Sequence, residues 1–165
     1  MMGEANSVTG LEVRVATEQD GPGLVALVNS AFAIESFLEG TRTDDAGLIR
    51  MMEKGKILVA LDGTGRLVGC VYTEIRGERG YLGMLAIDPQ RQGTGLARPL
   101  VGAAEEQFRR MGCETVDITV LSLRAELLPI YRRFGFQETG TEEMGPTRSL
   151  KPGVECHCIV MSKQL

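Results

Sequence analysis

The sequence has no excess of basic over acidic residues, no long apolar run and no amino-terminal targeting pattern. It holds 18 Lys and Arg residues against 22 Asp and Glu, a net charge of −4, which argues against a broad basic surface for nucleic acid. No apolar run approaches the roughly 20 residues that span a bilayer, and "MMGEANSVTG" lacks the basic-then-apolar order of a signal peptide. We therefore expect a soluble, cytoplasmic protein that binds neither nucleic acid nor membrane.

The four cysteines also lack the paired spacing of a metal site. Cys70 and Cys113 stand alone, and "CHC" at 156–158 has no second Cys or His cluster. On a strand, the two thiols of this triplet would share one face and the imidazole would point the other way. We expect reduced, buried thiols and no metal.

The chain fits one globular domain. Its 165 residues, 43% of them hydrophobic, suffice for a sizeable core, and there is no internal repeat or low-complexity tract. Residues 1–10 are small and polar, which predicts a flexible terminus before a domain at 11–165. Periodicity and turn residues predict strands near 11–16, 57–61, 67–75, 81–87, 115–121, 136–140 and 154–163, and helices near 20–32, 44–55, 95–112 and 124–134. This order of elements is that of a mixed α/β fold.

The stretch "LAIDPQRQGTGLARPLV", residues 85–101, contains the most informative motif. A strand ends at Asp88, and a helix begins near Gly95, so unpaired N–H groups and the positive end of the helix dipole face the turn. Gly93 and Gly95 would let a phosphate approach the main chain closely. A lone glycine pair is more often only a tight turn, so the motif needs further support.

Two familiar phosphate motifs do not fit these residues. A Walker loop requires Lys and then Ser or Thr after its last glycine, whereas Leu96 and Ala97 follow Gly95. A dinucleotide fingerprint requires a small residue where Arg98 stands, and it follows an initial βαβ unit rather than a series of hairpins. Both interpretations are excluded.

The segment from Gln92 to Ala97 resembles the acyl-CoA signature of the GNAT superfamily of N-acyltransferases, in which Gln or Arg precedes two residues, Gly, one residue, and Gly or Ala. "LAIDP" is similar to the usual lead-in, and "RAELLPIYRRFGFQETG" is similar to a later helix whose tyrosine, Tyr131, precedes a Gly-Phe pair. With the element order, the resemblance covers nearly all of residues 13–163. It implies a central, twisted, mostly antiparallel sheet of about seven strands flanked by about four helices.

The resemblance also implies roles for individual residues. The N–H groups of Gln92, Gly93, Thr94, Gly95, Leu96 and Ala97 would hold the CoA pyrophosphate, and the main chain of Leu85, Ala86 and Ile87 would pair with the pantetheine arm. One of these N–H groups would also polarise the thioester carbonyl. Tyr131 would protonate the leaving thiolate, although Leu127, Leu128 and Phe134 lie at helical spacing from it, so simple core packing is the alternative.

Three departures from the family pattern stand out. Arg124 replaces a frequent asparagine, and it would contact CoA, contact a neighbouring loop, or remain a solvated charge. Pro99 falls early in the helix after the turn, where its missing donor is tolerated. The strand "YLGMLAI" carries no carboxylate to serve as general base. Glu74 and His157 rank first as replacements, Glu35 and Glu39 follow, and deprotonation through water is a further alternative.

Together these features predict an N-acetyltransferase that transfers an acetyl group from acetyl-CoA directly to a primary amine of a small molecule. A non-catalytic acyl-CoA-binding or regulatory module is the alternative, because the base is missing. A protein acceptor is a third interpretation. The acids of "AIESFLEGTRTDD" would suit a cationic amine, although such loops are usually only solvated. The resemblance leaves open a homodimer paired through late strands such as "CHCIVM".

Overall fold

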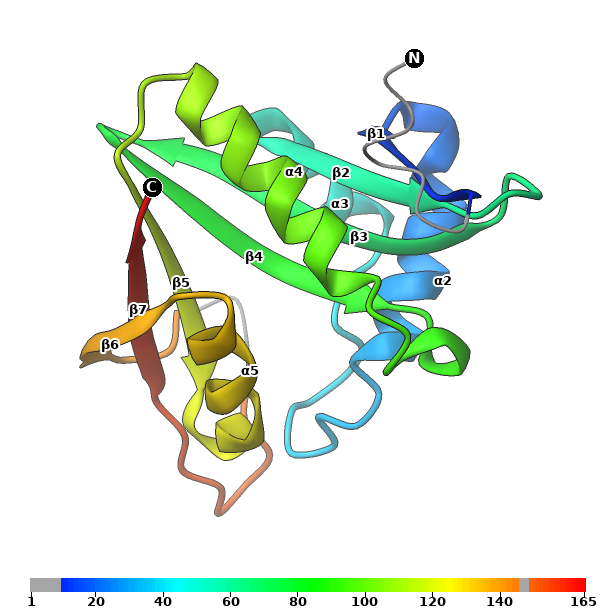
Figure 1. The fold of residues 1–165 in the computed structure, drawn as a ribbon. Coiled ribbons are helices and arrows are strands. Elements are labelled where there is room, and N and C mark those ends of the chain that lie inside the picture. The colour runs from blue at the N-terminus through cyan, green and yellow to red at the C-terminus, as the bar shows by residue number, and fades with distance from the viewer. Residues whose placement is uncertain (1–9, 146–148) are drawn as a thin grey trace.

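The computed structural model describes residues 10–145 and 149–165. Its strands form one seven-stranded sheet in the order β1-β2-β3-β4-β5-β7-β6, and β4–β5 is the one parallel pair within it (Figure 1). The strands are β1 (Glu12–Val15), β2 (Lys56–Leu61), β3 (Leu67–Arg76), β4 (Arg79–Ile87), β5 (Thr115–Leu121), β6 (Gln137–Glu142) and β7 (Cys158–Gln164). The predicted mixed α/β class and order of elements are confirmed. The predicted flexible terminus lies, apart from Gly10, outside the described residues.

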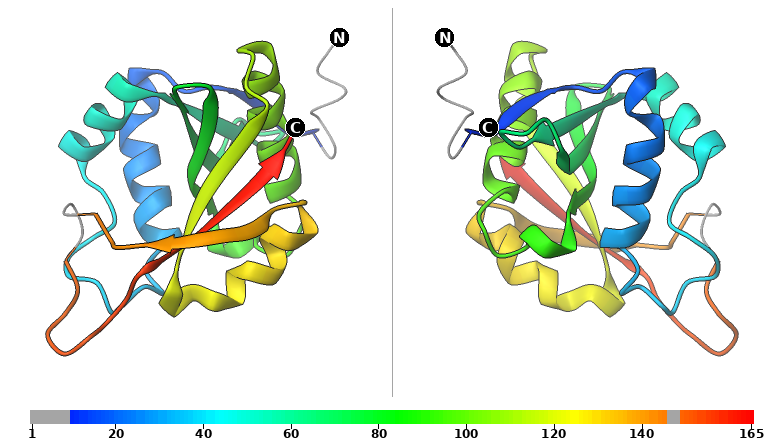
Figure 2. Two further views of the ribbon diagram at one scale, coloured as in Figure 1. Left: turned by 90° about the vertical axis from the view of Figure 1, so that its left-hand side faces the viewer. Right: turned by 90° about the vertical axis from the view of Figure 1, so that its right-hand side faces the viewer.

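Helices cover both faces of the sheet. They are α2 (Gly21–Ala31), α3 (Asp45–Lys54), α4 (Ala97–Arg110) and α5 (Leu128–Arg133), with short 3-10 helices η2 (Glu18–Asp20), η3 (Pro89–Arg91) and η4 (Ser122–Leu127). Figure 2 shows α2 and α3 on one side of the sheet and α4 on the other. Each side has its own apolar core, which we call the α4 core and the α2 core. None of the helices in the described part of the chain is long and apolar enough to cross a membrane.

The helix after the glycine turn is held by one apolar stripe. Leu100, Ala104 and Phe108 recur every four residues and are fully buried in the α4 core, as the helical period requires. Gly112 ends the helix with φ +86°, the left-handed conformation that favours glycine at this position. The helical spacing continues to Met111, but Met111 is 61% exposed because it lies beyond the end of α4 at Arg110.

The predicted helix at 124–134 is wrong in its first half. Residues 122–127 form η4, with Arg124 in a non-helical conformation, and α5 starts only at Leu128. Pro129 explains the break: it lacks an N–H, so it cannot continue a preceding helix but fits the first turn of a new one. The break places Arg124 beside the cavity described below.

The sheet opens between β4 and β5. The two strands are paired only through Gly80–Val116 and Tyr81–Asp117 in the described chain, and Figure 1 shows them diverging from that point. Along its other edge, β4 stays paired with β3, with a β-bulge that sets Val71 against two residues of β4. Met84 in this bulge has φ +50°, a strained value for a residue other than glycine, of the kind found beside functional sites. The remainder of β4 therefore presents an open main-chain edge to the gap.

Candidate active site

A cavity of about 770 Å³ passes through the gap between β4 and β5. This volume lies in the usual range for small-molecule sites. Its lining includes Leu85 and Ile87 from the α4 side of β4, and Tyr81 and Met84 from the α2 side. The cavity therefore connects the two faces of the sheet, so two molecules could meet within it from opposite sides.

Most of the predicted cofactor-binding residues line this cavity. Those that do are Leu85, Ile87, Gln92, Gly93, Gly95, Leu96, Ala97 and Arg124. Ala86 is not among them because its side chain is buried in the α2 core. Thr94 is not among them either; its hydroxyl donates a hydrogen bond to the carbonyl of Arg91. The cavity and these residues form one continuous surface from the open strand edge to the glycine turn.

Both glycines of the turn have left-handed backbones, φ +82° at Gly93 and +86° at Gly95. A Cβ at either position would meet no protein atom within 4 Å, so the requirement for glycine is conformational rather than steric. For residues other than glycine, this left-handed conformation costs roughly 1–2 kcal/mol of conformational free energy. The two glycines thus allow a concave main-chain shape that suits an anion at the start of α4.

We predict that Gly95→Ala weakens acetyl-CoA binding by about tenfold, because the turn must relax away from its left-handed backbone or remain strained. Isothermal titration with acetyl-CoA measures the effect. Gly102→Ala is the matched control: Gly102 lies within α4 with nothing within 4 Å of an added Cβ, so alanine there should leave the Kd unchanged. An unchanged Kd in Gly95→Ala would contradict the assigned role of the turn.

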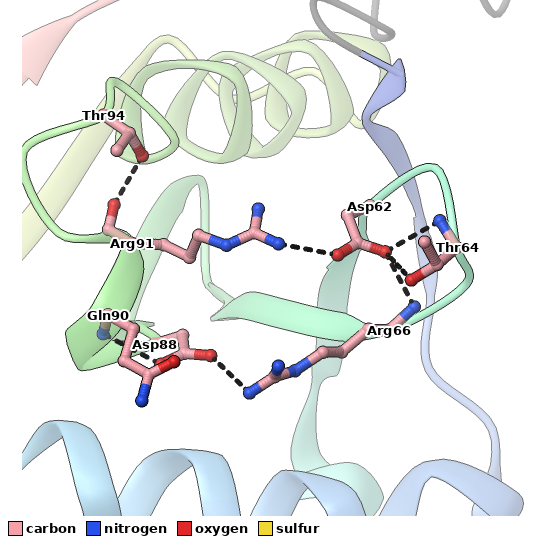
Figure 3. Close-up of polar contacts among 7 residues, drawn as sticks. All are labelled: Asp62, Thr64, Arg66, Asp88, Gln90, Arg91 and Thr94. Carbon is pink, nitrogen blue, oxygen red and sulfur yellow. Dashed lines mark hydrogen bonds and ion pairs between the residues drawn. The ribbon is translucent and has the colours of Figure 1, made fainter.

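A second loop holds the glycine turn in place. Asp62, in the turn between β2 and β3, accepts a hydrogen bond of 2.8 Å from Arg91, and Arg66 donates one of 3.1 Å to Asp88 (Figure 3). Asp62 also accepts from Thr64 and from the N–H of Arg66. The Thr64 hydroxyl, followed by these main-chain donors, holds the pKa of Asp62 well below its usual range. Asp62 is therefore ionised at neutral pH.

Removing this support should weaken cofactor binding without abolishing it. We predict that Asp62→Ala raises the Kd for acetyl-CoA about three- to tenfold, since it frees Arg91 and one side of the turn. The effect is moderate because the Arg91 side chain is 40% exposed, and ion pairs open to solvent contribute little. The same titration tests it. Glu78→Ala serves as control, because Glu78 is exposed in the hairpin at the opposite end of β3 and β4. Equal Kd values for the two variants would show that the turn holds its shape alone.

Tyr131 lines the cavity from α5. Its ring contacts Phe134 and Phe136 edge-on, with centroids 6.4 and 6.0 Å away, so the predicted packing contact is real. Its hydroxyl makes no hydrogen bond to the other described residues and is not fully enclosed by them. Burial, with a smaller contribution from Tyr81, raises the pKa of Tyr131 to about 12. The phenol thus faces the cavity in its protonated form, as a proton donor must.

The two first-ranked candidates for a general base do not line the cavity. Glu74 accepts hydrogen bonds of 2.7 Å from both Tyr72 and Arg76. Burial would raise its pKa, but the hydrogen bonds from Arg76 and Tyr72 outweigh burial and lower it. His157 is exposed just before β7, where its main-chain N–H donates a hydrogen bond to the Ser122 hydroxyl. Glu74 lies on β3 as predicted, whereas the predicted strand at 154–163 begins only at Cys158 and leaves His157 outside it. Sequence spacing could not indicate which way either side chain faces.

Glu35 lines the cavity but is not available as a base either. Its carboxylate is 4% exposed and is paired with Arg124 at 2.7 Å and with Arg42 at 3.5 Å. Arg124 therefore contacts the loop after α2, one of the alternatives raised by its sequence position. Glu39 is exposed and does not line the cavity.

Sequence reasoning missed the arginines of the cavity. The lining includes Arg42, Arg76, Arg91, Arg98 and Arg133. Arg91 stands inside the motif, so its position beside the glycines was a usable signal. The others come from four different elements or loops, and no local pattern marks them. In the described part of the chain, no group of three or more His, Cys, Asp or Glu side chains could hold a metal ion.

An open sheet with a glycine turn at the mouth of the gap is the architecture of an acyl-CoA-binding transferase, and comparison with known proteins agrees. The model of the acetyltransferase (GNAT) domain matches residues 25–145. The chain belongs to this family.

Individual relatives are more distant. A mycothiol acetyltransferase from Propionibacterium freudenreichii subsp. shermanii is 29% identical over 147 residues, which cover 84% of this chain and 47% of that protein. The chain thus spans about half the length of the curated relatives it matches. Among solved structures, a ribosomal-protein-alanine N-acetyltransferase from Brucella melitensis superposes with TM-score 0.75 at 23% identity, covering 93% of this chain and 99% of that one. A putative acetyltransferase from Salmonella typhimurium, solved with its cofactor acetyl-CoA, superposes with TM-score 0.73 at 20% identity, with 94% of each chain covered. These structural similarities show the shared fold.

Proposed function

We propose that the protein is an N-acetyltransferase that moves an acetyl group from acetyl-CoA directly to the primary amine of a small molecule. The main support is the cavity through the sheet. It connects the glycine turn, which suits a phosphate, with the opposite face of the sheet, from which an acceptor could enter. Location in the cytoplasm and pairing into a homodimer remain predictions from the sequence.

The residues present fit acetyl-CoA. Its pyrophosphate would lie on the main chain from Gln92 to Ala97, where the start of α4 favours an anion. Its pantetheine arm would lie along the open edge of β4, where Leu85 and Ile87 line the gap. The carbonyl of Ile87 accepts a hydrogen bond from the Gln92 side chain, which links the two parts of the site.

The bound thioester would supply an activated acetyl group. A main-chain N–H at the bulge of β4 would donate to the thioester oxygen as negative charge develops there. Tyr131 would give its proton to the departing sulfur. No side chain is assigned as base, so the attacking amine would lose its proton to water.

A non-catalytic acyl-CoA-binding module is the second candidate. It is favoured by one observation: among the described residues, the carboxylates that line the cavity are Glu35, which is ion-paired, and Glu142, at the exposed end of β6. Thiol release separates the two functions. Purified protein given acetyl-CoA and a panel of primary amines should release CoA, detected by a thiol reagent, and form the N-acetyl product by mass spectrometry. Binding of acetyl-CoA without release across the panel would favour the module.

A further inference from the structure

Arg76 occupies the side of the cavity opposite the glycine turn. It is the last residue of β3 and lines the cavity together with Tyr81. Its guanidinium stacks on the Tyr81 ring, 3.8 Å from the centroid, and Tyr81 packs against the α2 core rather than the α4 core. Arg76 therefore lies on the face from which an acceptor would enter.

Neighbouring groups hold this guanidinium in one orientation. Its Nε donates a 2.7 Å hydrogen bond to Glu74, whose other oxygen accepts from the Tyr72 hydroxyl. The Glu74 side chain is 17% exposed, whereas that of Arg76 is 56% exposed. The partly buried carboxylate and the aromatic ring thus fix the plane of a guanidinium that is itself open to solvent.

The two terminal nitrogens of Arg76 remain as donors. The hydrogen bonds recorded for Arg76 among residues 10–145 and 149–165 involve only its Nε. A guanidinium presents parallel N–H groups whose spacing matches the two oxygens of a carboxylate. Because this fork is already oriented, little side-chain entropy is lost when an anion binds.

In the loop after α2, the acid that lines the cavity is not free for a cationic acceptor. Glu35, the one carboxylate of the loop after α2 that lines the cavity, is engaged by Arg42 and Arg124. Arg42 also lies over the Phe32 ring, 4.0 Å from its centroid. The expectation that acids of this loop attract a cationic amine is therefore not supported by their arrangement.

We propose that the acceptor is a small amine that also carries a carboxylate, and that Arg76 binds this carboxylate through its terminal nitrogens. The inference rests on the proposed function. One oriented guanidinium suits a monoanion, and Tyr81 beneath it offers an apolar surface to the rest of the molecule. With the carboxylate held at Arg76, the amine is directed toward the gap between β4 and β5, where the thioester would lie. Arg76 is thus a specificity-determining residue.

The test compares matched acceptors. The wild-type protein is assayed for CoA release with amino acids and with the corresponding amino-acid amides, which differ only in the carboxylate. We expect kcat/KM to be about 10- to 100-fold higher for the acids, the range expected for hydrogen bonds to a charged group. Arg76→Gln should remove most of this preference by raising KM for the acids while leaving the amides unchanged, and Arg76→Lys should restore part of it.

Arg79→Gln is the matched control. Arg79 lies in the same hairpin and is paired with Asp117, but it does not line the cavity, so its substitution should keep the preference. Circular-dichroism melts establish that each variant is folded. CoA release without a preference for acids, or best release with diamines, overturns this inference and leaves the proposed function standing. No release with any amine overturns both.

Discussion

Replacing Tyr131 with Phe is expected to lower kcat by about 100-fold, within the range of general acid catalysis, while the KM for acetyl-CoA changes little. The substitution keeps the edge-on contacts with Phe134 and Phe136 and removes only the hydroxyl. Since that hydroxyl has no recorded partner among the described residues, its loss leaves no protein group unsatisfied. Steady-state kinetics of CoA release, alongside a thermal melt, measures both effects. A loss of less than about threefold would mean that Tyr131 only packs in the core.

The raised pKa of Tyr131 gives this role a pH signature. Burial favours the neutral phenol and raises its pKa to about 12, above the ordinary value of about 10. The group therefore stays protonated as the pH rises from about 7 to about 10, and loses its proton only nearer to the raised value. The wild-type kcat should show no decline from this group over that interval. A fall in kcat near pH 10 that is absent in Tyr131→Phe would indicate an unshifted phenol.

Replacing Glu35 with Ala should lower the free energy of unfolding by about 3–5 kcal/mol, the usual cost of removing one partner of a buried ion pair. The Glu35 side chain is 4% exposed, and those of its partners Arg42 and Arg124 are 14% and 13% exposed. Alanine would thus remove the carboxylate that lies between two poorly solvated guanidinium groups, of which Arg124 keeps its 2.7 Å pair with Glu126. Urea unfolding followed by circular dichroism gives the difference.

Glu39→Ala provides the comparison for that measurement. Glu39 lies in the same loop and is exposed, so its loss should change the free energy of unfolding by no more than about 0.5 kcal/mol. Similar values for the two variants would show that the Glu35 pairs are solvated in solution and contribute little. Because Glu35 and Arg124 join the loop after α2 to η4, the Glu35 variant should also disturb the acceptor side of the cavity.

The features that were predicted well from the sequence are determined by residues that lie close together along the chain. The order of elements and the approximate bounds of α3 and α4 follow from periodicity and from residues with special backbone preferences. The glycine turn was identified for the same reason, because its residues are consecutive. Two local features were missed: the break between η4 and α5, for which Pro129 was a visible signal, and the late start of β7 at Cys158.

The features that sequence could not predict depend on distant partners. Glu35 and Arg124 are 89 residues apart, and nothing in either segment indicates that they meet. The direction in which Glu74 faces is decided by Arg76 and Tyr72 across one strand surface. Charge alone therefore suggested an acidic, amine-attracting loop, whereas Arg42 and Arg124 engage Glu35, the acid of that loop that lines the cavity. Arg76 is an accessible charge on the same side.

The divergence of β4 and β5 gives the sheet two edges in its interior rather than only at its rim. Exposed edges ordinarily invite pairing with other chains and so promote aggregation. Here the unused hydrogen-bonding groups of β4 line a cavity within the sheet, where an extended, amide-containing molecule could pair with them. The fold thereby favours an extended ligand through main-chain contacts alone, before any side chain contributes to specificity.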